Sequence, residues 1–517
     1  MSQNGMVACA NPLASLVGVN VLQNGGNAMD ASVAMNAALN VLDPAMCGIG
    51  GDAFFLYYAA DKKKLFALNA SGRSPSAATL ESYNSQGIKE MPAVGPLSVT
   101  VPGGLDGWVK GLERFGSKPL SELLQPAIRY AEEGFPVNPM LNFFYRIRGR
   151  KVLSQFPESA AVYLPNGEIP ATGQVLKQPD LARSLRMIGE EGSDVFYKGR
   201  LGKQVVAALR KHGGLMTEED LAAHTSDWIE PISTSYGGTT VYELPPSTQG
   251  IALLQQLNVL SGYDFTNTHP ESADKLHLQI EAAKLAFSDL HEYITDPEFA
   301  DIPVSELLSE EYAAKRRALI DPAAAAKNIM AGLPEQENTT YITVVDRHGN
   351  VSSFINSLRN PFGSGLVAEG TGILMQNRGK DFSLDPDSAN RLAPNKRTMH
   401  TLNPIMVFKE GVPLISLGCV GGHQQTQGLQ QFLLNYLVSD YPLQQAIEAP
   451  RWSLSESGEV HIEPALAHAK EALEALGHEV VVGKTFFGAI QAVRIDPESQ
   501  VRFGGSDPRL DGIALGY

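Results

Sequence analysis

The 517-residue sequence is poor in cysteine and in positive charge. Its three cysteines, Cys9, Cys47 and Cys419, match no metal-ligand spacing and cannot all pair. We therefore expect buried, reduced thiols, and neither a disulfide framework nor a structural zinc site. The net charge of -15 and the pI near 5.3 argue against nucleic-acid binding, which needs a basic face. The only basic run, Lys62-Lys63-Lys64, is short, and we expect it at a hairpin tip.

Signals for membrane insertion, export and several enzyme classes are also missing. No apolar run approaches the roughly 20 residues that span a bilayer, and the first six residues lack a charged segment followed by an apolar one. We therefore expect a cytoplasmic protein that binds neither membrane nor nucleic acid. The chain has no GxSxG elbow, no HExxH pair, no phosphate-binding lysine loop and no internal repeat. The glycine-rich turn at 48–52 precedes a strand, whereas a dinucleotide site needs such a turn after one.

What is present is a composition typical of a soluble globular protein, 43% hydrophobic and 19% charged. Two strand-rich regions flank a mostly helical middle, which runs from Pro119 to about Met330 and contains one extended patch at 233–242. This order predicts an α+β protein with two sheets layered between helices. The expected helices are 13–22, one capped by Asn27 that runs toward Leu42, one behind Ser272, 426–438 and 466–476, and the expected strands are 53–58, 65–69, 339–345, 351–355, 414–417, 480–482 and 489–495.

One stretch, Asn338–Asp346, places a hydroxyl where a loop enters a strand. The polar, turn-prone segment 334–337 precedes it, and a turn at 346–350 leads to a second strand. If the bond between Asn338 and Thr339 were cut, Thr339 would carry a nucleophilic hydroxyl and an amine that can act as its base. Taken alone, however, a threonine at the start of a strand is ordinary, because its β-branched side chain suits a pleated surface.

Agreement along the rest of the chain favours the nucleophile. The sequence resembles the gamma-glutamyltransferase family nearly from end to end. The segments that carry the resemblance are Gly5-Met6-Val7-Ala8, Gly25-Gly26-Asn27-Ala28-Met29-Asp30-Ala31, Gly48-Ile49-Gly50-Gly51, Asn338-Thr339-Thr340 with Val344-Val345-Asp346, Phe362-Gly363-Ser364-Gly365, Gly421-Gly422 and Ser506-Asp507-Pro508-Arg509. Members of this family are N-terminal nucleophile hydrolases with a four-layer αββα fold. They are made as one inactive chain that cuts itself into two subunits and needs no metal or organic cofactor.

The resemblance implies a large subunit of residues 1–338 and a small subunit of residues 339–517. Thr339 resembles the nucleophile for self-cleavage and for turnover, and Thr340 is the nearest rival for the cut site. Gly421 and Gly422 resemble a backbone oxyanion hole, although two glycines can also form a simple tight turn. Ser357 occupies the place of a threonine that hydrogen-bonds the nucleophile.

Other positions resemble the family's binding site for the acyl donor. Arg73 falls where the family keeps an arginine for the donor's carboxylate, and Asp381 where it keeps an aspartate for the donor's α-ammonium. His400 and Thr401 replace a serine pair that holds the same carboxylate. Without the resemblance, Arg73 would be interpreted as a surface arginine.

Two departures from the family pattern concern the substrate. Arg359 and Arg378 stand where gamma-glutamyltransferases usually have asparagine and glutamine or glutamate. Two cations there would repel an ammonium or neutralise Asp381, while suiting a carboxylate through forked hydrogen bonds. We therefore expect an acidic donor without a free α-amine: a glutaryl, oxalyl or internal polyglutamyl group. The short segment between Phe382 and Pro394 also predicts that no lid loop covers the donor.

Three functions follow from these observations. The leading hypothesis is an autoprocessing amidohydrolase or acyltransferase that acts on a small acidic amide and passes the acyl group to water or an amine. If the two arginines point away from Asp381, the chain is a classical glutathione hydrolase, that is, a gamma-glutamyl transpeptidase. The third is an unprocessed pseudoenzyme that binds a small molecule. The sequence leaves open whether the protein forms a homo-oligomer.

Overall fold

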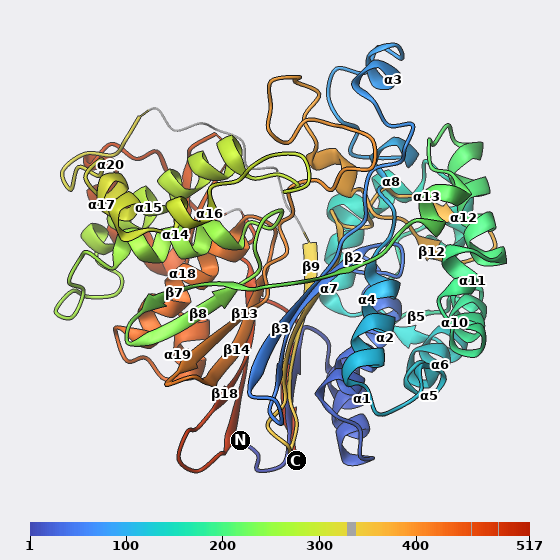
Figure 1. Cartoon of the computed structure of the whole chain (residues 1–517), viewed down its shortest axis with the longest axis horizontal. Helices are drawn as coiled ribbons and strands as arrows, with labels where there is room; N and C mark the ends of the chain where they lie inside the picture. The colour runs from blue at the N-terminus through green and yellow to red at the C-terminus, as the bar shows by residue number, and fades with distance from the viewer. Residues whose placement is uncertain (328–337, 456, 484) are drawn as a thin grey trace.

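The computed structural model of the chain describes residues 1–327, 338–455, 457–483 and 485–517. Two antiparallel sheets lie face to face in the middle of the molecule, and helices cover both outer sides (Figure 1). The four-layer αββα arrangement expected from the resemblance is therefore confirmed. The expected turn at 334–337 and the end of the helical region near Met330 lie outside the described residues. No helix in the described ranges combines the length and apolar character needed to cross a membrane.

The first sheet has seven strands, and the segment that begins at Asn338 forms one of its inner strands. β9 (Asn338–Val345) lies between β1 (Met6–Cys9) and β10 (Val351–Arg359). The predicted turn between β9 and β10 is confirmed, and its Gly349 has the positive φ of +82° that this turn requires. The remaining strands of this sheet are β2 (Asp52–Ala59), β3 (Lys64–Ala70), β6 (Asp227–Ile229) and β20 (Ile513–Gly516).

The second sheet has six strands, and its long strand β14 ends at the Gly421-Gly422 pair. β14 (Val412–Val420) extends beyond the expected 414–417 at both ends. The extended patch expected at 233–242 consists of two of the strands, joined by a glycine turn. The other strands of this sheet are β7 (Ile232–Tyr236), β8 (Thr239–Glu243), β13 (Ile405–Lys409), β18 (Ala489–Ile495) and β19 (Arg502–Ser506).

Small-residue helices cover the first sheet, as the sequence predicts. α1 (Pro12–Gln23) and α2 (Ala28–Leu42) have N-caps at Asn11 and Asn27, whose side chains accept from amides of the first turn. On this side of the molecule, and beyond it in the helical middle, lie α4 (Gly104–Phe115), α6 (Gln125–Glu133), α10 (Pro179–Glu191) and α12 (Arg200–Lys211). The second sheet is covered by α14 (Gly250–Leu260), α15 (Ala273–Tyr293), α18 (Gln424–Leu437) and α19 (Leu443–Glu448), with α17 (Glu310–Arg317) outside them.

Shorter elements complete the chain. The described part of the helical middle contains three short strands that the periodicity does not indicate, β4 (Phe135–Pro136), β5 (Val175–Leu176) and β6. The helix expected at 466–476 begins as a 3-10 helix (Pro464–Ala469) and is α-helical from Lys470. The short helices are α3 (Leu80–Asn84), α5 (Leu120–Leu123), α7 (Pro139–Phe144), α8 (Arg150–Leu153), α9 (Pro157–Tyr163), α11 (Asp194–Tyr197), α13 (Glu218–Ala222), α16 (Val304–Leu307) and α20 (Lys470–Ala475). The other short strands are β11 (Val367–Ala368), β12 (Ile373–Leu374), β15 (Trp452–Leu454), β16 (Val460–Ile462) and β17 (Val480–Val482).

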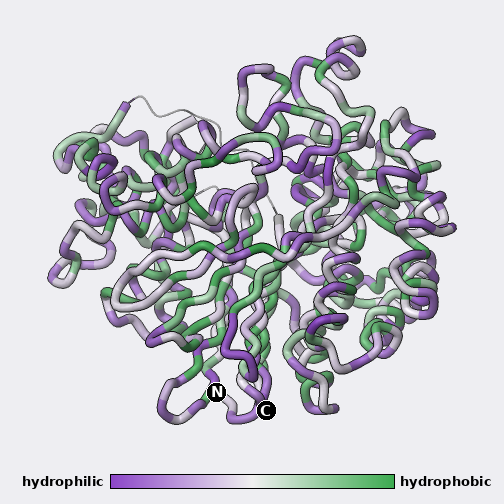
Figure 2. The backbone as a smooth tube through the Cα atoms, in the orientation of Figure 1, coloured by the Kyte–Doolittle hydropathy of each residue, from purple (hydrophilic) through white to green (hydrophobic). Residues whose placement is uncertain are grey.

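The packing of the two sheets brings the start of β9 to the end of β14. The Thr343 hydroxyl donates to Ser416 Oγ at 2.8 Å, and two residues earlier the Tyr341 ring fills the space beside Gly418, where a Cβ would lie 2.4 Å from it. The second of these contacts is two residues further along each strand than the first, toward the start of β9 and the end of β14. The same spacing next brings Thr339 on β9 level with Val420 on β14. The strands carry apolar stretches between these layers, whereas polar residues concentrate on the outer turns and helix faces (Figure 2).

Candidate active site

Thr339 is the second residue of β9, and its side chain is buried, with 1% exposed. It follows Asn338 directly in the same strand. Its Oγ1 lies 3.4 Å from Nε2 of Gln425, which donates to it. The hydroxyl of the rival Thr340 instead donates to the Asn356 carbonyl at 3.3 Å and so bonds to its own sheet.

Gly421 and Gly422 form the loop between β14 and α18. Their φ values of +114° and +59° lie in the region that favours glycine, and a Cβ on Gly421 would come within 3.3 Å of the Gly488 Cα. The Gly422 carbonyl accepts from Nε2 of Gln249 at 2.9 Å. The loop thus stands at the N-terminus of a 14-residue helix, where backbone dipoles stabilise negative charge.

Ser357 lies where β10 leaves its regular pairing with β9. The register shifts between Asn356 and Arg359, and the Ser357 Oγ accepts from the Arg359 amide at 2.7 Å. Arg359 itself has a φ of +82°, which is unusual for a residue with a side chain. The irregularity turns the Arg359 side chain away from the strand and toward Asp381.

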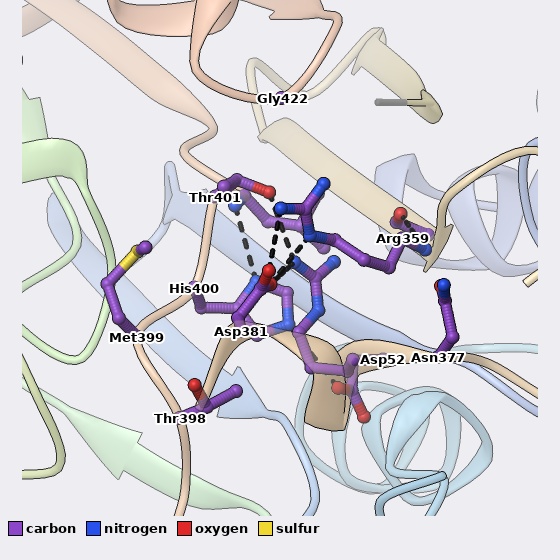
Figure 3. A network of polar contacts seen from close by, with 12 residues as sticks. Asp52, Arg359, Asn377, Asp381, Thr398, Met399, His400, Thr401 and Gly422 are labelled. Atoms are coloured by element: carbon purple, nitrogen blue, oxygen red, sulfur yellow. Dashed lines mark hydrogen bonds and ion pairs between the residues drawn. The ribbon is translucent and has the colours of Figure 1, made fainter. Parts of the chain in front are cut away.

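Both arginines that differ from the family pattern bind Asp381. Figure 3 shows Arg359 beside Asp381. Arg359 binds it in a forked pair, Nε to Oδ2 and Nη2 to Oδ1, both at 2.6 Å, and Arg378 Nη1 lies 3.2 Å from Oδ2. Burial alone would raise the pKa of Asp381. The charge and hydrogen bonds of Arg359 and the charges of Arg378 and Lys380 outweigh burial and lower this pKa to about 2. Both arginines therefore point toward Asp381, as the leading hypothesis expects, and the alternative in which they point away does not match the structure.

Thr401 and His400 lie beside this cluster (Figure 3). Arg378 Nη1 donates to Thr401 Oγ1 at 3.1 Å, and His400 Nε2 lies 3.3 Å from Oδ2 of Asp52. Burial, together with the charges of Arg378 and Arg359, lowers the pKa of His400 well below its ordinary value, so its ring is neutral.

Asp52 supports the loop that carries His400. Its Oδ1 accepts from the amides of Gly72 and Gly103 and from Gln376 Nε2, at 3.0 to 3.2 Å. Burial raises the pKa of Asp52 to about 6, although the Arg378 charge and these hydrogen bonds act in the opposite direction. Asp52 therefore hydrogen-bonds three segments that are far apart in the sequence, and it lies next to the arginine cluster.

Arg73 lies apart from the contacts just described. Its guanidinium pairs with Glu298 at 2.9 Å and lies 3.9 Å from Asp227, and its side chain is 22% exposed. Arg397 shares Asp227 at 2.6 Å. Among the described residues, Arg73 forms no ion pair or hydrogen bond with Asp381. Its backbone nevertheless follows Gly72, which donates to Asp52, so Arg73 stands at the rim of the same region.

Sequence reasoning missed a set of buried amides that join the parts of the site. Gln249 Nε2 donates to the carbonyls of Thr401 and Gly422, and its Oε1 lies 2.9 Å from His423 Nδ1. The Asn403 amide donates to Gln425 Oε1 at 3.3 Å. The run Gln424-Gln425-Thr426-Gln427 at the start of the helix was the available signal, since buried polar side chains need partners.

One described cluster has the composition of a metal site. His277, Glu281 and His478 are buried, and their ligand atoms lie within 4.8 Å of one another. The Lys284 ammonium already lies 2.8 Å from Glu281 Oε1, and His277 Nδ1 lies 2.8 Å from His478 Nε2. These contacts describe a hydrogen-bonded cluster whose carboxylate is already paired with a lysine.

Comparisons with known proteins agree with the geometry. A family model described as Gamma-glutamyltranspeptidase matches residues 14–517. The "Glutathione hydrolase-like YwrD proenzyme" of Bacillus subtilis (strain 168) is 38% identical, over 99% of this chain and 98% of that protein. The "Acylase ACY 1 proenzyme" of Pseudomonas sp. (strain SE83) is 38% identical, over 99% and 93%. The crystal structure of a cephalosporin acylase from Bacillus halodurans superposes with a TM-score of 0.94 at 40% identity, covering 100% of this chain and 96% of that one.

Proposed function

The chain belongs to the gamma-glutamyltranspeptidase family, and on that premise we propose that Thr339 is the nucleophile of an amidohydrolase that first cuts its own chain. Cleavage between Asn338 and Thr339 would yield a large subunit of residues 1–338 and a small subunit of residues 339–517. The word proenzyme in the names of both relatives supports this proposal.

Self-cleavage uses the hydroxyl that the fold buries at the start of β9. Thr339 Oγ1 attacks the carbonyl carbon of Asn338, the peptide C–N bond breaks, and the hydroxyl proton passes to the Thr339 nitrogen. Water then hydrolyses the ester, which frees the amine of Thr339 and restores its hydroxyl. The position of Gly421 and Gly422 at a helix N-terminus supports their role as donors to the oxyanion that forms in each step.

In turnover the same hydroxyl attacks the amide of the substrate, with the new amine as base. The substrate's C–N bond breaks, its amine leaves with the proton, and the acyl group stays on Thr339 until water or an acceptor amine takes it. Ser357, which accepts from the Arg359 amide, keeps the end of β10 in place beside β9. Because the proton transfers use the amine and hydroxyl of one residue, the mechanism places no demand on a second titrating side chain.

The acyl donor, we propose, is acidic and lacks a free α-ammonium. The observation that carries this proposal is the forked pair between Arg359 and Asp381. An ammonium in this region would meet two guanidinium groups and a carboxylate that already has its partners, whereas a carboxylate is attracted to the guanidinium groups. His400 and Thr401 would line the same end of the donor. The names of two similar proteins, an acylase and a cephalosporin acylase, support an acyl amide as the substrate.

Intact mass spectrometry of the purified protein and of Thr339→Ala tests the nucleophile. We expect two fragments that meet between Asn338 and Thr339 in the wild type, and one full-length chain in the variant. A wild-type chain that stays uncut under native conditions would remove the enzyme assignment and favour the pseudoenzyme that binds a small molecule.

The donor is tested on the processed protein with two chromogenic amides, glutaryl-p-nitroanilide and gamma-glutamyl-p-nitroanilide. They differ only by the α-amine. We expect kcat/KM for the glutaryl compound to exceed that for the gamma-glutamyl compound by at least about tenfold, the ratio that 1.4 kcal/mol of binding discrimination gives. The reverse order would instead favour a classical glutathione hydrolase.

A further inference from the structure

Among the described residues, Gln425 donates a hydrogen bond to the proposed nucleophile oxygen. Its Nε2 lies 3.4 Å from Thr339 Oγ1, and the exposed fractions of the two side chains are 0% and 1%. Gln425 belongs to the first turn of α18, and its backbone amide donates to the Gly422 carbonyl at 3.1 Å. One short stretch of chain therefore supplies both the glycine loop and a side-chain amide at Thr339.

The other end of the Gln425 side chain determines which atom faces Thr339. The backbone N–H of Asn403 lies 3.3 Å from Gln425 Oε1, and because an N–H only donates, the oxygen must face Asn403. The NH₂ group then faces Thr339, whose oxygen accepts. A hydroxyl that accepts at its oxygen retains its own hydrogen for transfer, as a nucleophile with an amine base requires.

The surroundings hold this arrangement in place. Asn403 is fully buried, and its Nδ2 donates to Glu243 Oε1 at 3.1 Å, while Gln249 Nε2 lies 3.2 Å from Asn403 Oδ1. Gln249 also binds the carbonyl of Gly422. Gln425 thus belongs to a buried amide network that reaches the nucleophile on one side and the glycine loop on the other. Such networks orient their members when each group has a partner.

We propose that Gln425 is a further catalytic residue that donates a hydrogen bond to Thr339 Oγ1; this rests on the function proposed above. Its largest effect falls on release of the acyl group. In the acyl-enzyme Oγ1 is the bridging oxygen of an ester. Water attacks the acyl carbon and gives a proton to the Thr339 amine. The C–Oγ1 bond then breaks, the electron pair stays on Oγ1, and the ammonium returns the proton to it. The Gln425 amide stabilises the negative charge that develops on Oγ1 in this step.

The test compares two leucine variants of the full chain on the same helix. Gln425→Leu removes the donor at nearly constant volume. Gln430→Leu makes the same change at a buried glutamine whose Nε2 donates to the Gln279 carbonyl at 3.1 Å. Self-cleavage is followed by intact mass spectrometry after cell-free synthesis. Acyl-enzyme is followed by the same method during turnover of glutaryl-p-nitroanilide.

We expect self-cleavage to slow about tenfold in Gln425→Leu, as loss of one hydrogen bond predicts, and acyl-enzyme to accumulate. Gln430→Leu should resemble the wild type in both. Gln425→Glu keeps an acceptor for Asn403 and regains a donor only when its carboxyl is protonated, so its cleavage rate should recover as the pH falls. A general packing defect would produce neither this recovery nor the accumulated ester.

Two results would overturn the inference. If the wild type and Gln425→Leu cut themselves at equal rates and Gln425→Leu accumulates no more acyl-enzyme than the wild type, Gln425 has no catalytic role, whereas Thr339 remains the nucleophile. If the wild type stays uncut, the proposed function fails and the role of Gln425 fails with it.

Discussion

Thr339 and Asp381 lie in two halves of the candidate site that use different chemistry. In the nucleophile half, formed by Thr339, Gly421, Gly422 and Gln425, the contacts between described residues are hydrogen bonds of neutral amides. In the recognition half, formed by Arg359, Arg378, Asp381 and Thr401, the contacts are those of guanidinium groups with a buried carboxylate. Under the proposed function, the neutral half would carry out the reaction on any amide, whereas the charged half would select which acyl group binds.

The charged half and the neutral half should affect different properties of the protein, the first its stability and the second its reaction rate. A buried charge needs its partner, because an unpaired one cannot regain the solvation it has lost. The recognition half is therefore the part whose disruption should weaken the fold. A neutral hydrogen bond contributes less to stability, but it can change the rate when it touches a reacting atom.

The largest stability effect is expected for Arg359→Met. Among the described residues, Asp381 would lose its forked pair and keep the Arg378 contact at 3.2 Å, so the loss should lie near the lower end of the roughly 3–5 kcal/mol that breaking a buried ion pair costs. The measurement is denaturant unfolding in a Thr339→Ala background, so that every variant unfolds as a single chain. Glu122→Gln is the control, because its pair with Lys118 is about half-exposed on the glutamate side, and such pairs contribute roughly 0–1 kcal/mol. Equal losses of unfolding free energy in the two variants would mean that the Arg359–Asp381 pair contributes no more to stability than a partly exposed pair.

The pH dependence of stability should distinguish the halves further. Glu243 lies in the amide network behind Thr339, and burial raises its pKa to about 8, although Asn403 and the Leu244 amide act in the opposite direction. Because the folded pKa is raised, Glu243 contributes stability below its ordinary pKa and loses it as the pH rises through about 8. Asp381, with a pKa lowered to about 2, behaves oppositely: its contribution is present above its ordinary pKa and disappears as the pH falls toward 2.

Glu243→Gln tests this difference. Glutamine resembles the protonated acid, so we expect the variant to exceed the wild type in unfolding free energy by a few kcal/mol at pH 9, and to match it near pH 5. Unfolding midpoints at the two pH values give the comparison. If the variant and the wild type have the same unfolding free energy at both pH values, a positive charge near Glu243 must offset its burial.

Much of the nucleophile half could be predicted from the sequence, because local features encode it. A threonine at a strand start and a glycine pair between a strand and a helix are visible in order along the chain, and both lie where the pattern indicates. β1 was missed as a strand because Met6–Cys9 is too short to show an alternating pattern. Gln249 could not be assigned, because its partner Gly422 lies 173 positions away and a packed helix offers no periodic signal for one amide.

The recognition half was predictable in its members but not in their pairing. The residue types at Arg359 and Arg378 suggested a changed substrate, yet two outcomes stayed open: arginines directed at Asp381 or away from it. The φ of +82° at Arg359 and the register shift of β10 decide between them, and neither follows from local propensity. The positions of Arg378 and Asp381 themselves depend on how η4, a single 3-10 turn at Arg378–Asp381, packs in the fold.

The smallest effect is expected at Arg73, which decides how far the recognition half extends. Its pair with Glu298 is partly exposed, so Arg73→Ala should change the unfolding free energy by less than about 1 kcal/mol. If Arg73 binds the donor's carboxylate from the rim, its loss raises KM for an acidic amide about threefold to fivefold and leaves kcat unchanged, because the contact is equal in the ground and transition states. Glu298→Gln should lower KM, since it removes the carboxylate that competes with the donor. Steady-state kinetics on glutaryl-p-nitroanilide measure both variants. If neither variant shifts KM, Arg73 belongs to the surface and the donor is held by Arg359 and Arg378 alone.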